Sequence, residues 1–262
     1  MFRKRGLINN KGQVTIFIII AILVIALAVL AYFFIPGLRS NVSQSAQSPS
    51  EFIETCIKEK IQNTIETISL QGGDFEIQEE SSYFYKGDYL KYLCYINEYY
   101  KPCIIQEPFL KEHFEQEIKN EISNDVNSCF ESMVANYRNK GYEVTLKNSE
   151  TDSVVEISPY KIVVNFDNEL ILKKSDTENY DSFYIILNSN LYELLDIAKN
   201  ILVWEIDTGD SITEAYMTYD PYVKVEKRRK SDETKVYILT DRRTDEVFQF
   251  AVRSWALPPG YT

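Results

Sequence analysis

The sequence predicts an α+β protein: an N-terminal transmembrane helix followed by an extracytoplasmic domain of antiparallel sheets and packed amphipathic helices. Three observations carry this prediction. An uncharged run of 22 residues, Val14 to Ile35, stands near the start of the chain. Two long stretches then show apolar residues every three or four positions, and the period falls toward two from Tyr142 onward.

These patterns predict four segments. We expect a basic leader over residues 1–12, a transmembrane helix over 13–36, a flexible linker over 37–50 and an α+β domain over 51–262, with a candidate sub-boundary near residue 141. The last segment has ample length for a buried core.

The apolar run is long enough, at about 1.5 Å per residue, to cross a hydrocarbon core of roughly 30 Å. Because basic flanks stay cytoplasmic, we expect a single-pass membrane protein with its C-terminal domain extracellular. The basic residues before the run are Arg3, Lys4, Arg5 and Lys11, and only Arg39 follows closely.

Three interpretations of the leader remain open. One is an uncut membrane anchor, and another is a secretory signal cut near Ala26-Leu27-Ala28. The third starts from Lys11, Gly12 and Gln13, a charged residue, a glycine and a glutamine directly before the apolar run. This arrangement resembles the class III signal peptides of archaeal type IV pilins and archaellins. The resemblance implies that a prepilin-peptidase-like enzyme cuts after Gly12, although Phe17 stands where many members of that family have glutamate.

A longer resemblance covers most of the chain. The segments KGQVTIF, LQGG (Leu70 to Gly73), EISNDVNSC (Glu121 to Cys129) and FAVR (Phe250 to Arg253) are similar to a family of uncharacterised single-span surface proteins of small-genome archaea. This resemblance implies the architecture more than an activity.

Charge is unevenly distributed along the chain. The first 39 residues hold five Lys/Arg and no Asp/Glu, so 23 basic and 39 acidic residues remain for the rest. A surface of that sign repels phosphate backbones. We therefore expect no nucleic-acid partner, and the expected partners are membrane lipid, the processing peptidase and other copies of the chain.

Four cysteines fall in the predicted ectodomain, where disulfides persist. Their spacing lacks a C-x-x-C pair and the chain has one histidine, which disfavours a zinc site. Of three connectivities, we favour Cys94 with Cys103 across a short loop and Cys56 with Cys129 between two helices. Four reduced, buried cysteines are the alternative.

Pro36-Gly37 is expected to break the membrane helix, and residues 40–50 then form a flexible polar tether. In this tether, Asn41 begins the chain's only Asn-x-Ser/Thr glycosylation sequon. A helix is predicted from Pro49 to Leu70, ending at Gly72-Gly73. Its apolar stripe favours packing against the core over a membrane surface. The stripe consists of Ile53, Ile57, Ile61, Ile65 and Ile68.

Residues 83–105 are rich in tyrosine, which suits both half-buried strands and binding surfaces for sugars or proteins. Packing is the favoured interpretation, and a binding surface is the alternative. The candidate binding residues are Tyr92, Tyr95, Tyr99 and Tyr100.

The longest predicted helix runs from Pro108 to Lys140 and closes at Gly141. Its polar face carries His113, which we interpret as a boundary residue because no G-x-S-x-G nucleophile motif accompanies it. The apolar stripe consists of Leu110, Phe114, Ile118, Ile122, Val126, Cys129, Met133 and Tyr137.

Alternating β-branched residues predict strands in the second half of the chain, with one helix from Asn190 to Val203 among them. The predicted strands are 142–146, 153–157, 161–166, 169–173, 182–187, 222–227, 235–240 and 246–253.

Two groups of charged residues are candidate binding sites. The basic run from Lys227 to Lys230 suits either a solvated strand end, which we favour, or docking to an acidic neighbour. Asp207, Asp210 and Glu214 lack the EF-hand pattern, so we prefer a helix N-terminus there over Ca²⁺ binding. No cofactor motif is found, and we predict no catalytic or metal site.

Two main functional hypotheses follow. The first is a non-enzymatic, pilin-like filament subunit processed after Gly12. The second is an uncleaved, membrane-tethered module that binds a surface glycan or protein. A glycosidase using paired carboxylates is a third, because such pairs are distant in sequence.

Overall fold

The protein's structure is a computed structural model that describes residues 19–25, 47–147 and 152–258. The chain divides into two compact units, Met1–Ser48 and Pro49–Thr262. In the first unit, the described residues 19–25 are helical, and their apolar side chains are exposed.

The structure corrects the predicted transmembrane helix over residues 13–36 and the single-pass membrane location that depends on it. Crossing the hydrocarbon core takes about 20 helical residues. Among the residues that the structure describes, no helix has both the length and the apolar composition of a membrane span. Lys11, Gly12, Gln13 and Asn41 lie outside the described residues.

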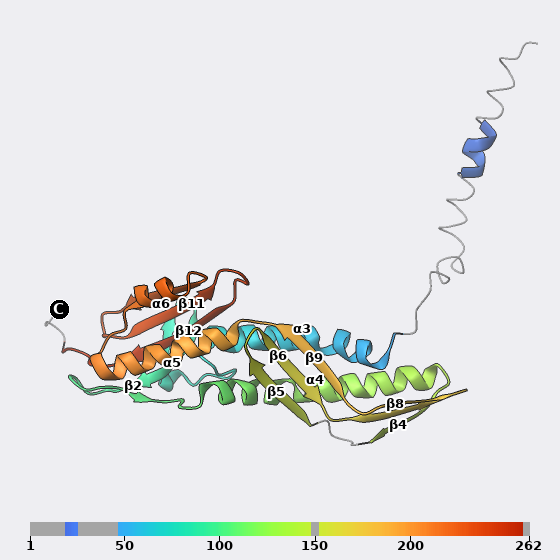
Figure 1. Ribbon diagram of the computed structural model, residues 1–262, viewed down its shortest axis with the longest axis horizontal. Helices are drawn as coiled ribbons and strands as arrows, with labels where there is room; N and C mark the ends of the chain where they lie inside the picture. Colours follow the sequence, from blue (N-terminus) through green and yellow to red (C-terminus); the bar gives the residue numbers. More distant parts are fainter. Residues whose placement is uncertain (1–18, 26–46, 148–151, 259–262) are drawn as a thin grey trace, which may run out of the picture. The chain divides into compact units, whose positions relative to one another are not determined.

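The second unit is built around two long helices that lie side by side (Figure 1), α3 (Pro49–Gln71) and α4 (Leu110–Asn139). Both were predicted within two residues of these bounds. Their predicted apolar stripes are buried, with Ile53, Ile57, Ile61 and Ile68 of α3 at most 1% exposed. Each fully buried isoleucine side chain contributes about 2 kcal/mol of transfer free energy, so the facing stripes anchor the core.

The end of α3 depends on its two glycines. Gly72 and Gly73 both have positive φ angles, and the Gly73 N–H donates to the Ile68 carbonyl at 2.8 Å, which closes the last turn. A Cβ on Gly72 would lie 3.0 Å from Lys91 Cβ, so the chain passes closely beside strand β2 here.

Two disulfides are present, with the connectivity that the sequence analysis favours. Cys56–Cys129 joins α3 to α4 across 73 residues of sequence, and Cys94–Cys103 closes a loop of the aromatic region.

Three sheets accompany the helix pair (Figure 1). The largest has the strand order β1-β2-β12-β11-β10, with β3 also paired to β2, and the two three-stranded sheets have the orders β4-β7-β8 and β5-β6-β9. The strands are β1 (Ser82–Tyr85), β2 (Asp88–Tyr95), β3 (Ile104–Ile105), β4 (Glu143–Lys147), β5 (Ser153–Ser158), β6 (Lys161–Phe166), β7 (Glu169–Lys173), β8 (Thr177–Tyr180), β9 (Phe183–Asn188), β10 (Val223–Arg229), β11 (Lys235–Asp241) and β12 (Val247–Arg253).

One pairing was not predicted. Strands β2 and β12 pair in parallel, with Cys94 opposite Val252, although most of the domain's sequence separates them. The other pairings are antiparallel, as predicted.

The remaining helices are α5 (Leu191–Thr208), α6 (Thr213–Tyr219) and a single 3-10 turn, η1 (Glu79–Ser81). Helix α5 packs against α4, β11 and β12, and it extends five residues beyond its predicted end at Val203. The extension carries Glu205, which is fully buried.

We predict unequal costs for removing the two disulfides. Replacing Cys56 and Cys129 by alanine releases the longer loop and should lower the free energy of unfolding by about 4 kcal/mol, against about 3 kcal/mol for Cys94 and Cys103, because the entropy of a closed loop grows with its length. Urea unfolding of both double variants measures this. A larger loss for the Cys94/Cys103 variant would contradict the loop-length explanation.

Candidate functional site

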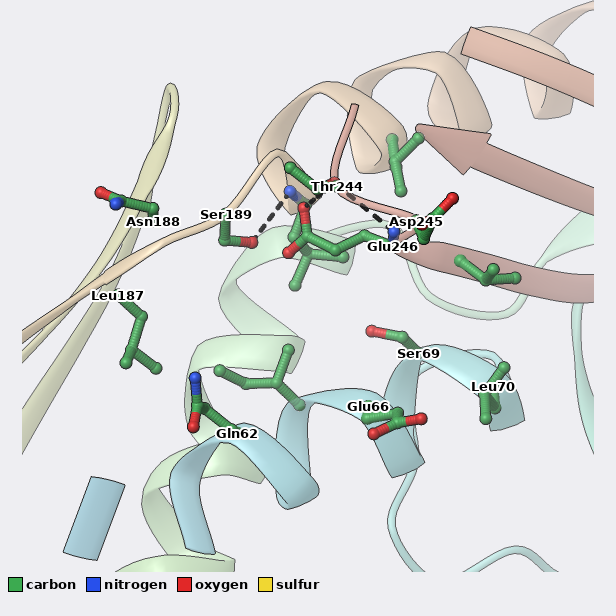
Figure 2. Close-up of a pocket in the computed structure, with 14 residues that line it drawn as sticks. Gln62, Glu66, Ser69, Leu70, Leu187, Asn188, Ser189, Thr244, Asp245 and Glu246 are labelled. Atoms are coloured by element: carbon green, nitrogen blue, oxygen red, sulfur yellow. Dashed lines mark hydrogen bonds between the residues drawn. The ribbon is translucent and has the colours of Figure 1, made fainter. Parts of the chain in front are cut away.

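A cleft of about 410 Å³ lies between α3, the start of α5 and the turn that joins β11 to β12 (Figure 2). Gln62, Glu66 and Ser69 line it from α3, because positions four and then three residues apart share one helix face. Its size falls within the range of small-ligand sites, roughly 300–1,000 Å³.

The cleft is apolar in part. Leu191 and Leu194 of α5 are buried, and they line it together with Leu187 at the end of β9. Ile65 of α3 and Val247 of β12 complete the apolar lining.

Glu246 fixes the start of α5 and thereby one wall of the cleft. Its carboxylate accepts a hydrogen bond from the Asn190 N–H at 2.7 Å and another from the Thr244 hydroxyl at 2.8 Å. Ser189 adds a second cap, because its Oγ accepts from the Leu191 N–H at 3.1 Å. A carboxylate is favourable here because the helix dipole is positive at the N-terminus.

Three carboxylates line the cleft without a cationic partner. In residues 47–147 and 152–258, no Lys, Arg or His makes an ion pair with Glu66, Asp245 or Glu246. Of the three, Glu246 is half-buried, whereas Glu66 and Asp245 are exposed. The cleft therefore presents uncompensated negative charge beside apolar surface.

Ser69 adds a polar group to the cleft. Its side chain is 5% exposed, it forms no hydrogen bond within the described part of the chain, and its hydroxyl points into the cleft in Figure 2. The hydroxyl is therefore open to a hydrogen bond from a ligand in the cleft, in place of water. An apolar lining, a free hydroxyl and carboxylates together suit a cationic group on an aliphatic stem.

The four candidate tyrosines do not form one surface. Tyr92 and Tyr95 are half-buried and pack with ring centroids 4.8 Å apart, and burial raises the pKa of Tyr92 to about 12. The Tyr92 hydroxyl lies 2.9 Å from Thr234 Oγ1. Tyr99 and Tyr100 are 43% and 53% exposed. The first pair therefore packs partly within the domain, and the second pair is more open to solvent.

His113 is not an isolated boundary residue. Its Nε2 lies 2.6 Å from Asp74 Oδ1, and Lys91 Nζ donates to the same oxygen at 2.6 Å. Glu107 lies 3.3 Å from Lys91 and 3.4 Å from His113. Burial alone would raise the pKa of the Asp74 carboxyl, but hydrogen bonds from His113 and Lys91 outweigh it and hold that pKa below its ordinary value.

Residues of the basic run Lys227 to Lys230 and of the acidic group around Gly209 form ion pairs within the domain. Lys227 Nζ donates to Asp210 Oδ1 at 2.6 Å, and Arg228 pairs with Glu226 at 2.5 Å. Within the described residues, no three His, Cys, Asp or Glu side chains are arranged to hold a metal ion.

The cleft leaves no signal in the sequence. Glu66 and Ser69 are polar positions of an amphipathic helix, and Asp245 and Glu246 are turn residues, so nothing in the sequence marks them as neighbours. Comparison of the chain with protein-family models, with curated proteins and with solved structures gives no match. The function must therefore be argued from the geometry.

We predict that Asp74 makes folding sensitive to acid. Because its pKa is lowered in the folded state, the unfolded chain takes up the proton first as pH falls. The stabilisation is complete well above the ordinary value of 3.8 and is lost as pH falls through the lowered pKa. Asp74→Asn should flatten the decline of unfolding free energy below pH about 5, whereas Asp88→Asn, at an exposed position, should leave it unchanged. Equal acid sensitivity of wild type and Asp74→Asn would contradict this.

Proposed function

We propose that this chain is a non-enzymatic extracytoplasmic protein that binds a protein partner, and that a lysine side chain of the partner enters the cleft between α3, α5 and the β11–β12 turn. The observation that carries the proposal is the set of carboxylates without an ion-pair partner in the described residues, beside an apolar lining and the Ser69 hydroxyl, which forms no hydrogen bond there.

Lysine matches this combination of groups. Its four methylene groups bury along apolar surface while the ammonium donates up to three hydrogen bonds. Glu66 and Asp245 supply acceptors at the edge of the cleft, and Ser69 supplies one inside it. The remainder of the cleft, lined by backbone and side chains from separate elements, suits an extended peptide segment around that lysine.

The two disulfides support an extracytoplasmic location. Cytosolic thiols are generally kept reduced, whereas secreted domains use disulfides for stability. All four cysteines of the chain are in disulfides.

We predict charge-selective binding of a lysine peptide. A capped pentapeptide with central lysine should shift the NMR signals of Ser69, Glu66 and Asp245, whereas the same peptide with norleucine, which keeps the aliphatic stem without the ammonium, should not. Combining Glu66→Gln with Asp245→Asn should weaken binding about two- to thirtyfold, since each exposed ion pair is worth about 0.2–1 kcal/mol. Asparagine tolerates the positive φ angle of Asp245.

Glu131→Gln is the control for this experiment. Glu131 is an exposed residue of α4 outside the cleft. Its replacement removes one negative charge, as each of the two cleft substitutions does, but leaves the cleft unchanged. Equal binding of the two peptides, or equal weakening by the control, would contradict the proposal.

A second candidate function is a pilin-like filament subunit, favoured by Lys11, Gly12 and Gln13 directly before the apolar run. In this case the leader is removed, and the apolar segment of one subunit packs against those of others.

If this chain is a pilin-like subunit, we predict that the protein isolated from its native cells begins at Gln13. N-terminal sequencing measures this. Gly12→Val should leave the leader attached, because the peptidase would have to accept a bulky residue at the cleavage site. Gly6→Val, in the same leader, is the control. A wild-type start at Met1, or normal processing of Gly12→Val, would exclude this candidate.

A further inference from the structure

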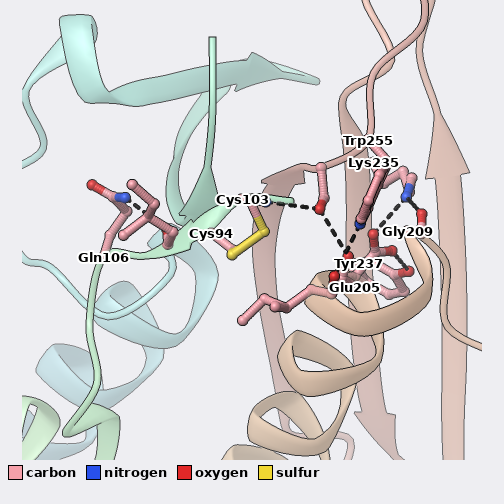
Figure 3. The surroundings of a disulfide bond; sticks show 11 residues. Cys94, Cys103, Gln106, Glu205, Gly209, Lys235, Tyr237 and Trp255 are labelled. Atoms are coloured by element: carbon pink, nitrogen blue, oxygen red, sulfur yellow. Dashed lines mark hydrogen bonds and ion pairs between the residues drawn. A yellow bond between two sulfur atoms is a disulfide. The ribbon is translucent and has the colours of Figure 1, made fainter. Parts of the chain in front are cut away.

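A lysine, a glutamate and a tyrosine meet in the core where α5 ends against β11 (Figure 3). Lys235, Glu205 and Tyr237 are 1%, 0% and 0% exposed. Lys235 Nζ lies 2.5 Å from Glu205 Oε2, and the Tyr237 hydroxyl donates to Glu205 Oε1. Since a carbonyl C–O bond is about 1.23 Å long, the amine nitrogen lies within about 3.7 Å of the carboxyl carbon, which approaches the separation of a reactive pair.

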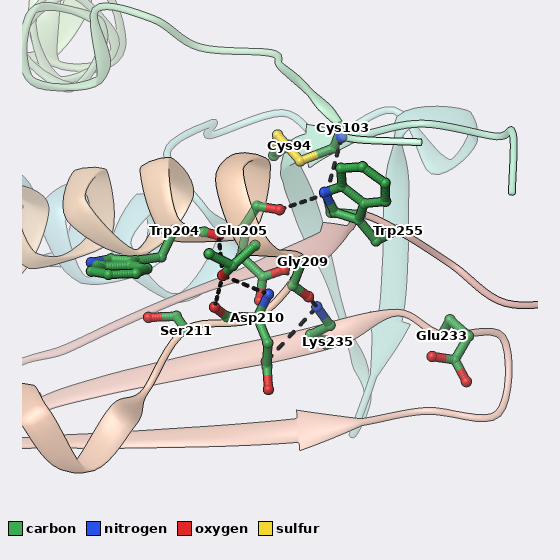
Figure 4. A network of polar contacts seen from close by, with 12 residues as sticks. Cys94, Cys103, Trp204, Glu205, Gly209, Asp210, Ser211, Glu233, Lys235 and Trp255 are labelled. Atoms are coloured by element: carbon green, nitrogen blue, oxygen red, sulfur yellow. Dashed lines mark hydrogen bonds and ion pairs between the residues drawn. A yellow bond between two sulfur atoms is a disulfide. The ribbon is translucent and has the colours of Figure 1, made fainter. Parts of the chain in front are cut away.

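The surrounding backbone fixes these groups. Gly209 ends α5 with a φ of 78°, and its carbonyl accepts a hydrogen bond from Lys235. A Cβ at Gly209 would lie 2.8 Å from Trp255, so no other residue fits without a shift (Figure 4). Ser254 Oγ donates to the Glu205 carbonyl at 2.8 Å and accepts from the Cys103 N–H at 3.0 Å, which links the site to the Cys94–Cys103 disulfide.

One further carboxylate stands at the edge of this site. Asp210 Oδ1 lies 3.9 Å from Lys235 Nζ, and the Asp210 side chain is 48% exposed, so it connects the buried amine to solvent. Its hydrogen bond from Lys227 holds it in place.

We propose that Lys235 and Glu205 condense to form an isopeptide bond, an intramolecular amide that joins β11 to α5. The established contacts of the two side chains are those of an ion pair, and proton transfer from the ammonium to the carboxylate gives the neutral amine and the neutral acid without a change in net charge.

The reaction balances without an oxidant, a reductant or a co-reactant. The amine nitrogen of Lys235 attacks Cδ of Glu205, forming the C–N bond. The C–O bond to Oε2 then breaks, and this oxygen leaves as water with the proton it already carries and one from the amine. Asp210 is positioned to carry the amine proton, and the Tyr237 hydroxyl donates to Oε1, where negative charge develops.

The burial of the site favours the amide. A buried ion pair retains much of the desolvation cost of its two charges, whereas an amide removes both charges. Holding the reacting groups in contact replaces an encounter in solution by an effective concentration of roughly 10⁵ M or more. Burial also raises the pKa of the Glu205 carboxyl despite the opposing effect of Lys235, which favours the neutral acid that reacts.

Such a bond would add a third covalent link to the domain. The two disulfides tie α3 to α4 and close the loop after β2, and the amide would tie α5 to β11. Unlike the disulfides, it would survive reduction.

Mass spectrometry of the purified protein with its disulfides reduced and capped tests the proposal. We expect a mass one water below that of the uncondensed chain, with Lys235→Arg, prepared identically, as the reference without this loss. Arginine keeps a cation beside Glu205 but cannot form the amide. Trypsin should fail to cleave after Lys235 and should release a branched peptide joined to the segment between Lys199 and Lys224.

Fragmentation of the branched peptide locates the bond, because this segment contains both Glu205 and Asp210. Tyr237→Phe should slow cross-linking about tenfold or more, since it removes the donor to Oε1. Tyr216→Phe is the control, because the Tyr216 hydroxyl contacts Ser211 instead. A wild-type protein that keeps its full mass after prolonged incubation, or a branch at Asp210, would overturn the proposal.

Discussion

The packing of α3 against α4 is the constraint on which the rest of the domain depends. Both helices bury an unbroken apolar stripe, and Cys56–Cys129 fixes them in register. Helix α3 then contacts β2, β9 and β12, while α4 contacts β4, β5 and α5, so each of the three sheets rests on this pair (Figure 1). The turn at Gly72-Gly73 follows from the same packing, since the chain must leave α3 beside β2.

The position of the cleft follows from this arrangement. Its α3 wall comes from the edge of the buried stripe, where Ile65 is half-buried and Ser69 faces inward, and its other wall is the start of α5, held by Glu246. Elsewhere the acidic domain neutralises its buried charges internally, at Asp74 with His113 and Lys91, at Asp241 with Arg243 and at Glu205 with Lys235. The carboxylates of the cleft lack such ion pairs and stand beside apolar surface.

Local patterns predicted most of the second unit. The isoleucine spacing predicted α3 and its buried face, and the two amphipathic helices made the Cys56–Cys129 pairing reasonable. The parallel β2–β12 pairing and the cleft join distant segments, and no local pattern reports such contacts. Glu205 was detectable: it continues the stripe of Leu194, Ala198 and Leu202, and a carboxylate at a core position requires a buried partner. The predicted membrane span falls mostly on residues outside the described ranges, and no helix within those ranges has the length and apolar composition to cross a membrane.

A crystal structure of the protein grown with the lysine pentapeptide tests the central claim, that the cleft receives a cationic side chain, most directly. The account predicts the lysine stem along Ile65 and Val247, with its ammonium within hydrogen-bonding distance of Ser69 Oγ and of the Glu66 or Asp245 carboxylate. An empty cleft at saturating peptide, or the peptide bound on another face of the domain, would contradict it.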